Sequence, residues 1–245
     1  MTHSEIFRTV RPLLACLLWG GLLVGASAVA AEIQPRSLPS DGERPRIVAF
    51  GDSLTSGLGV AAEEAYPAQL QRRLDQAGFR YRVINAGVSG DTTAGGVRRV
   101  AWVMKSKPRI VILELGGNDG LRGLSLQETR ANLERMIEQF QQASVTVVLA
   151  GMKLPPNYGA EYTAGFETLY PALAKKYRLT LIPFFLGNVA GSESLNQSDG
   201  IHPTAEGYKL IVETMLETMK PVLEADTRKS GRGGHHGRSA AMPDD

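Results

Sequence analysis

Cysteine is almost missing from this chain of 245 residues, which contains Cys16 and no other. Cys16 lies in an apolar leader that we expect to be removed, so the mature protein would contain no cysteine. This lack excludes disulfide bonds, a cysteine nucleophile and a metal site built on thiolates.

Histidine is also scarce. The four histidines are His3 in the leader, His202, and His235 and His236 in a tail rich in glycine and arginine. His202 is therefore the only histidine expected in the folded part. Because a second histidine is lacking there, we expect no metal ion, although Asp52 and Asp119 could serve as ligands.

An excess of charge of one sign is absent as well. The formal net charge is +2, and removing residues 1–31 leaves +1. Such near neutrality gives no indication of a nucleic-acid partner. It fits an enzyme that acts on neutral or amphiphilic small molecules, and it fits many other soluble proteins. The length allows one large domain or two small ones.

Residues 1–31 have the pattern of a signal peptide. A positively charged segment precedes the uncharged run LLACLLWGGLLVG, and the small residues of ASAVAA allow cleavage after Ala30 or Ala31. We therefore predict a periplasmic or secreted protein with no stable membrane insertion after cleavage. The alternative is a retained anchor, because the 19 uncharged residues at positions 13–31 nearly suffice to span a bilayer.

The rest of the chain divides by composition. Residues 32–45 (EIQPRSLPSDGERP) are rich in proline and serine and are interpreted as a linker. Residues 226–245 form a basic, glycine-rich tail with almost no large apolar residue, which we expect to be disordered. This leaves a single folded domain over residues 46–225.

Five short apolar runs in this domain predict strands. They are rich in β-branched residues and lie at residues 46–50, 81–86, 109–115, 145–151 and 179–184. Nearly continuous apolar runs are typical of parallel strands buried on both faces of a sheet. Helical patterns separate them, so we predict an α/β fold, a three-layer α/β/α sandwich around a five-stranded parallel sheet.

Three helices can be placed from local signals. Ser125 and Glu128 form a capping-box pattern at the start of the first. A second apolar stripe, over residues 166–177, contains Pro171, which either kinks that helix or marks its start. We expect the last helix to begin at Pro203, because proline is favoured in a first turn.

Polar residues gather where the predicted strands end. Ser53 follows the first run, Gly87 and Gly90 follow the second, Asn118 follows the third, and Asp199 and His202 lie in the last loop. Ligands of parallel sheets bind at this edge. A serine nucleophile needs a base, and the base needs a carboxylate that orients it. The oxyanion needs amide donors. Residues of each type are present here.

Each of these residues also has a structural interpretation when it is taken singly. Ser53 could cap the following helix, as serines after strands often do. A single histidine beside a proline is more often structural than catalytic. Asn118 and the glycines could be turn residues.

Taken together, the motifs resemble the four blocks of the SGNH, or GDSL, hydrolase superfamily. These motifs are GDSL, SGDT, GGND and DGIHP, and the resemblance covers about residues 47–222. The runs LELGGNDGLRG, LPPNYG, YPALAKKY and PFF are similar to the branch of periplasmic acyl-CoA thioesterases, arylesterases and lysophospholipases. One small departure is Thr55 in GDSLT, at a position where serine is common.

The resemblance implies a flavodoxin-like fold and a role for each matching residue. Ser53 matches the nucleophile, Asp199 the acid and His202 the base. The backbone amides of Ser53 and Gly90 and the side chain of Asn118 match the oxyanion hole. Gly87 falls outside the pattern and is expected to be a turn residue.

The same resemblance implies where the substrate binds. In this branch the segment after the Asn-Asp pair lines the acyl groove, so we expect Leu121 and Leu124 to contact substrate. We also expect the stretch from Asn118 to the cap at Ser125 to lack regular structure.

We therefore predict a serine esterase or thioesterase that forms an acyl-enzyme on Ser53. Its expected substrates are small acyl esters: aryl esters, acyl thioesters and lysophospholipids. No metal or organic cofactor and no nucleic acid is implied, and we expect a monomer. The alternatives are a carbohydrate acetylesterase of the same superfamily, a flavodoxin-like binding module without catalysis, and an inert envelope protein.

Overall fold

The computed structural model describes residues 44–233. The predicted signal peptide, the predicted linker up to residue 43 and residues 234–245 of the predicted tail lie outside the described residues. Between residues 44 and 233, no helix combines the length and the apolar character that crossing a membrane requires.

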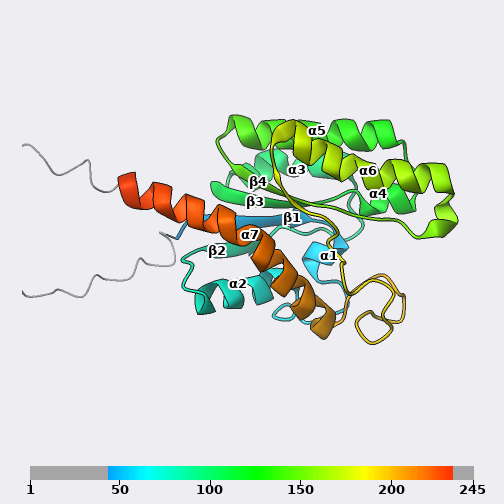
Figure 1. The fold of residues 1–245 in the computed structure, drawn as a ribbon, viewed down its shortest axis with the longest axis horizontal. Coiled ribbons are helices and arrows are strands. Elements are labelled where there is room, and N and C mark those ends of the chain that lie inside the picture. Colours follow the sequence, from blue (N-terminus) through cyan, green and yellow to red (C-terminus); the bar gives the residue numbers. More distant parts are fainter. Residues whose placement is uncertain (1–43, 234–245) are drawn as a thin grey trace, which may run out of the picture. The chain divides into compact units, whose positions relative to one another are not determined.

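Five parallel strands form one sheet in the order β2-β1-β3-β4-β5 (Figure 1). The strands are β1 (Arg46–Gly51), β2 (Arg82–Asn85), β3 (Pro108–Glu114), β4 (Thr146–Ala150) and β5 (Thr180–Ile182). The five predicted runs are confirmed, and so is the parallel sheet. The order reverses beside β1, because the chain first moves outward to β2 and then returns to β3 on the other side. Such a switch point is where an open α/β sheet binds its ligand.

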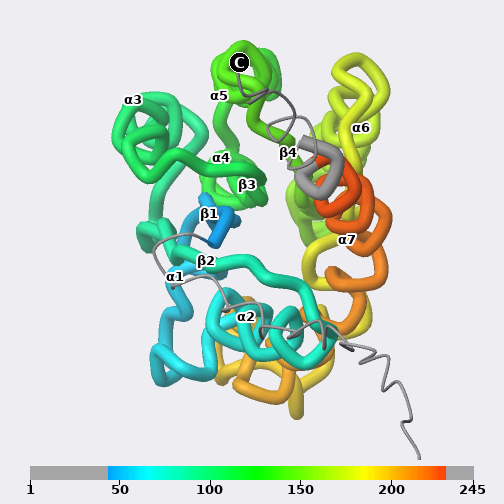
Figure 2. Tube along the Cα trace, turned by 90° about the vertical axis from the view of Figure 1, so that its left-hand side faces the viewer, coloured from blue at the N-terminus to red at the C-terminus, as the bar shows by residue number. Residues whose placement is uncertain are grey.

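Helices cover both faces of this sheet. One face carries α3 (Thr93–Met104), α5 (Leu126–Gln142) and α6 (Ala160–Tyr177), and the other carries α2 (Tyr66–Gln76) and α7 (Ala205–Gly233) (Figures 1 and 2). Three short helices complete the described part of the chain: α1 (Ser53–Ser56), α4 (Gly117–Leu121) and the 3₁₀ helix η1 (Pro156–Tyr158). The three-layer α/β/α prediction is confirmed.

The expected burial of every strand on both faces is wrong for the sheet edges. In the central strand β3, the residues from Ile110 to Glu114 are all buried, whereas no residue of β2 is fully buried. An edge strand has a neighbouring strand on one side only, and the flanking helices cover it less completely. The apolar core therefore centres on β1, β3 and β4.

The second predicted helix starts earlier than its apolar stripe. Helix α6 begins at Ala160 and runs through Pro171, so Pro171 lies inside the helix and does not mark its start. The start of α5 is confirmed, because the Ser125 hydroxyl accepts a hydrogen bond from the Glu128 amide at 3.3 Å.

The last helix does not begin at the predicted proline. Pro203 forms an isolated antiparallel bridge with Asn196, and this extended pairing delays the start of α7 to Ala205.

The predicted start of a disordered tail at residue 226 is wrong for residues 226–233, which continue α7. Asp226 is 8% exposed and accepts a hydrogen bond from the Tyr81 hydroxyl at 2.8 Å. Its carboxylate also binds the Arg109 guanidinium at 2.6 Å. The prediction counted apolar residues, whereas an acidic residue anchors this part of the helix.

Candidate active site

The turn between β1 and α1 presents Ser53. Asp52 is the N-cap of α1, and its Oδ1 accepts a hydrogen bond from the Leu54 amide at 3.0 Å. The interpretation of Ser53 as the helix cap is therefore wrong. A Cβ on Gly51 would lie 2.0 Å from the Thr55 hydroxyl oxygen, so the turn is too tight for a side chain there.

Ser53, His202 and Asp199 form a continuous chain of hydrogen bonds. The Ser53 Oγ lies 2.9 Å from the His202 Nε2, and the His202 Nδ1 lies 2.6 Å from the Asp199 Oδ2. The other carboxylate oxygen of Asp199 accepts the backbone amides of Ile201 and His202, both at 2.9 Å. The carboxylate can therefore orient the ring while its own loop holds it in place.

The pKa of the Asp199 carboxyl is lowered in this loop. Desolvation alone would raise its pKa, but hydrogen bonds from the amide and ring of His202 and from the Ile201 amide lower the pKa to about 2. A charged carboxylate beside the imidazole stabilises the imidazolium form, which is what a base needs when it takes up a proton.

The loop that carries the acid and the base is fastened to the nucleophile turn. Gln197 closes the loop, since its amide donates to the His202 carbonyl at 2.7 Å. The Gln197 side chain donates to the Leu58 carbonyl at 2.7 Å, just beyond α1. A Cβ on Gly59 would lie 2.0 Å from the Gln197 Oε1, so residue 59 must be small for this contact to form.

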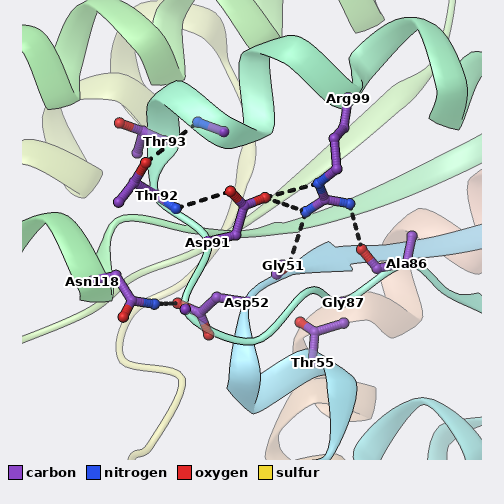
Figure 3. A network of polar contacts seen from close by, with 12 residues as sticks. Gly51, Asp52, Thr55, Ala86, Gly87, Asp91, Thr92, Thr93, Arg99 and Asn118 are labelled. Carbon is purple, nitrogen blue, oxygen red and sulfur yellow. Dashed lines mark hydrogen bonds and ion pairs between the residues drawn. The ribbon is translucent and has the colours of Figure 1, made fainter.

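Asn118 lies in the first turn of α4, and its side chain points toward the nucleophile turn (Figure 3). One N–H of its amide donates to the Asp52 Oδ2 at 3.0 Å. An amide nitrogen carries two hydrogens, so the second remains for an oxyanion. The expectation of an irregular segment after Asn118 is wrong, because α4 extends to Leu121.

Gly90 lies in the loop that follows β2, with a φ of +77° that favours glycine. This loop packs against the nucleophile turn, because the Val88 amide donates to the Gly51 carbonyl at 3.1 Å. Within residues 44–233, the backbone amides of Ser53 and Gly90 have no acceptor, so both are available to a ligand. Gly87 packs tightly on α1, and a Cβ there would lie 2.2 Å from the Ser56 amide nitrogen.

An apolar cavity of about 680 Å³ opens beside Ser53, Asn118 and His202. Its apolar lining includes Leu121, Met152, Leu154, Phe184, Leu186 and Ile201. Leu124 is not part of this lining and is 40% exposed. The structure therefore brings Leu121, but not Leu124, to the candidate site.

Two buried carboxyls, those of Asp52 and Glu114, lie under the nucleophile turn. Glu114 was not identified from the sequence. Burial raises the pKa of Asp52 to about 6, although the Leu54 amide and the Asn118 side chain donate hydrogen bonds that act in the opposite direction. Burial and the nearby Asp52 carboxyl raise the pKa of Glu114 well above its usual value. Glu114 accepts the Thr55 hydroxyl at 2.7 Å. A glutamate within the apolar run RIVILEL was a signal that could have identified it.

Asp119, considered above as a metal ligand, has a structural role. Its carboxylate accepts the Thr93 amide at 2.8 Å at the start of α3, and it also accepts the Thr93 hydroxyl. Within residues 44–233, no three His, Cys, Asp or Glu side chains cluster in a way that could hold a metal ion.

Comparisons with known proteins agree with the resemblance seen in the motifs. Residues 49–210 match the GDSL-like Lipase/Acylhydrolase family. The chain is 41% identical to the Esterase TesA of Pseudomonas aeruginosa, over 72% of this chain and 89% of that protein. It is 36% identical to the Thioesterase 1/protease 1/lysophospholipase L1 of Escherichia coli K12, over 74% of this chain and 86% of that protein. The crystal structure of AlinE4, an SGNH-hydrolase family esterase, is 46% identical with a TM-score of 0.63, over 76% of this chain and 98% of that one.

Proposed function

Because the chain belongs to the GDSL-like lipase/acylhydrolase family and is a carboxylic ester hydrolase, we propose that it hydrolyses acyl esters and thioesters through an acyl-enzyme on Ser53. One observation carries the proposal. The hydrogen-bonded chain from Asp199 through His202 ends at Ser53, which lines an apolar cavity of about 680 Å³.

Acylation begins when the Ser53 Oγ attacks the substrate carbonyl carbon and passes its proton to the His202 Nε2. A bond forms between Oγ and that carbon, and the carbonyl oxygen becomes an oxyanion. The intermediate collapses, the bond to the leaving oxygen or sulfur breaks, and His202 returns the proton to the leaving group. Water then passes a proton to His202 and attacks the acyl carbon. The bond between that carbon and the Ser53 Oγ breaks, His202 returns the proton to Oγ, and the acid is released.

The oxyanion is stabilised by three donors around the nucleophile. We assign them as the backbone amides of Ser53 and Gly90 and the second N–H of the Asn118 side chain. Both amides lack an acceptor within residues 44–233, and the bond to Asp52 fixes the plane of the Asn118 amide. Donors held in place in this way do not have to reorganise as charge develops.

The acyl group occupies the apolar cavity. A cavity of about 680 Å³ with Leu121, Met152 and Leu154 in its wall suits a medium or long chain better than an acetyl group. The names of the relatives add thioesters and lysophospholipids as substrate classes. We propose these classes, together with aryl esters, for this chain.

A fluorophosphonate tests the proposed nucleophile. It phosphonylates a serine that a neighbouring base activates, so a single adduct is expected on Ser53. Peptide mass spectrometry locates the adduct, and the Ser53→Ala variant is the control that must remain unlabelled. An intact esterase that takes up no label, or takes it up on another serine, would contradict the assignment.

Two substitutions separate the roles of the oxyanion donor and the acyl wall. Asn118→Ala is expected to lower kcat by about 10²–10³-fold on every acyl chain length, because one oxyanion donor is lost wherever the chain lies. Leu121→Ala is expected to leave acetate esters nearly unchanged and to weaken octanoyl and longer substrates by about 1–3 kcal/mol.

The measurement is kcat/KM for nitrophenyl esters from acetate to palmitate. Leu124→Ala is the matched control, because Leu124 lies outside the cavity lining. A loss that grows with chain length in Asn118→Ala, or a uniform loss in Leu121→Ala, would mean that these roles are reversed. Acetate as the preferred wild-type substrate would favour the carbohydrate acetylesterase.

We also propose that the enzyme acts outside the cytoplasm, after cleavage near Ala31. The charged leader, the apolar run and the small residues of ASAVAA support this location. N-terminal sequencing of protein released by osmotic shock tests it. An intact Met1 in the membrane pellet would instead favour a retained anchor.

A further inference from the structure

Arg99, on the second half of α3, uses its guanidinium to join three segments near the site (Figure 3). Its Nε donates to the Asp91 Oδ2 at 2.8 Å, and its Nη2 forms an ion pair with the same oxygen at 2.7 Å. Its Nη1 donates to the Ala86 carbonyl at 2.9 Å, and its Nη2 donates to the Gly51 carbonyl at 3.2 Å. No other described side chain binds both the end of β1 and the loop after β2 in this way.

The positions of these acceptors show which segments Arg99 connects. Gly51 is the last residue of β1 and lies two residues before Ser53. Ala86 and Asp91 stand on either side of residues 87–90, the loop that carries Gly90. One guanidinium therefore holds both ends of the Gly90 loop and ties them to the strand that presents Ser53.

Asp91 is itself held from several sides. Its Oδ1 accepts the Thr92 amide at 3.1 Å, and a Cβ on Gly95 would lie 1.6 Å from the same oxygen. The carboxylate thus sits against the first turn of α3, where only glycine leaves room for it. The Arg99 guanidinium lies 4.7 Å from the centre of the Phe50 ring. The Asp91 and Arg99 side chains are 11% and 20% exposed, so water screens this ion pair only partly.

We propose that Arg99 and Asp91 are positioning residues for the oxyanion hole, and that they set the separation between the backbone amides of Ser53 and Gly90. The inference rests on the proposed function, because it concerns those two donors. Neither residue lines the cavity. Both act through the backbone that they hold.

Lysine cannot replace Arg99 in this role. Its ammonium group is a single point with a flexible stem, whereas the planar guanidinium presents several donors in fixed directions. An ammonium that reaches Asp91 keeps the ion pair but cannot also bind Ala86 and Gly51 in the observed geometry. Arg99→Lys therefore removes the positioning while it retains the charge.

The experiment compares Arg99→Lys and Asp91→Asn with Arg109→Lys. Arg109 also pairs with a buried aspartate, but at the beginning of β3, where no site residue lies. The first measurement is kcat and KM on an octanoyl ester. Arg99→Lys is expected to lower kcat by about 30–100-fold, since a misplacement of about 1 Å costs on that order, and to leave KM within about threefold. Asp91→Asn is expected to lower kcat by about tenfold, and Arg109→Lys to keep the wild-type value.

The second measurement uses two ketones with the same alkyl chain. The Ser53 Oγ adds to the carbonyl of a trifluoromethyl ketone, its proton passes to His202, and the resulting alkoxide occupies the oxyanion hole. The matching methyl ketone binds without this addition. Arg99→Lys is expected to weaken the trifluoromethyl ketone by the same factor as kcat and to leave the methyl ketone unchanged.

A stabilising role alone predicts a different pattern. If Arg99→Lys lowers Tm as Arg109→Lys does but keeps its kcat, or weakens both ketones equally, the positioning role is wrong. Asp91→Asn provides the same comparison if Arg99→Lys does not fold. A wild-type enzyme that forms no adduct with the trifluoromethyl ketone, or a Ser53→Ala variant that retains activity, would instead refute the proposed function itself.

Discussion

Replacing His202 with alanine is expected to lower kcat for ester hydrolysis by about 10⁵–10⁶-fold, to the residual rate that binding and oxyanion stabilisation sustain. The reason is that, among the residues that the structure describes, the His202 Nε2 at 2.9 Å is the only base hydrogen-bonded to the Ser53 hydroxyl. Steady-state kinetics on an octanoyl ester measure the effect, and KM should change little because the apolar side chains that line the cavity are unchanged.

Chemical rescue gives this prediction a specific control. Removal of the ring leaves a gap beside Ser53, and free imidazole that enters it can accept the serine proton. Millimolar imidazole is therefore expected to restore part of the activity of His202→Ala and none of the activity of Ser53→Ala. Substantial turnover by His202→Ala without imidazole would show that another group is the base.

Asp199→Asn is expected to lower kcat by about 10⁴-fold, which is the loss seen when the acid of a serine hydrolase is neutralised. The amide keeps the size of the carboxylate but loses the charge that stabilises the imidazolium, and it favours the wrong tautomer of His202. The loss should appear in kcat and not in KM. Equal activity of Asp199→Asn and the wild type would mean that the contact at 2.6 Å has no role in the reaction.

The pH dependence follows from the lowered pKa of Asp199, about 2. The folded value lies below the unfolded one, about 3.9, so its contribution to stability is present above pH 4 and is lost as the pH falls through 2. Asp199 therefore stays ionised throughout an ordinary assay. A pH–rate profile of the wild type measured above pH 4 is therefore expected to contain no step from Asp199.

The strands and the order of the motifs could be predicted from the sequence because both have local signals. Apolar β-branched runs marked all five strands, and the capping-box pair of Ser125 and Glu128 marked the start of α5. Parallel strands end at one edge of a sheet, so residues as distant as Ser53 and His202 could be expected to meet. Helix α3 gave a weaker signal, because Gly95 and Gly96 interrupt its apolar pattern.

The contacts that hold the site could not be predicted in this way. Arg99 and Asp91 are eight residues apart, across a loop and a helix, and no periodic pattern relates a guanidinium to carbonyls in two other segments. The hydrogen bond between Tyr81 and Asp226 could not be predicted for the same reason, since 145 residues separate the partners. Polar contacts of this kind depend on tertiary geometry, whereas apolar periodicity records only which face of an element is buried.

The course of α7 matters for the use of this protein as an immobilised catalyst. The 29-residue helix begins beside the loop that holds His202, and further along it Asp226 meets Tyr81 and Arg109 at the end of the sheet where the strands begin. Lys229 is exposed near its far end, about 35 Å along the helix from Ala205 at a rise of about 1.5 Å per residue. Because Cys16 is the only cysteine of the chain, a thiol introduced at position 229 would give the domain from residue 44 onward one attachment point. A resin coupled there would leave the acyl cavity facing the solution.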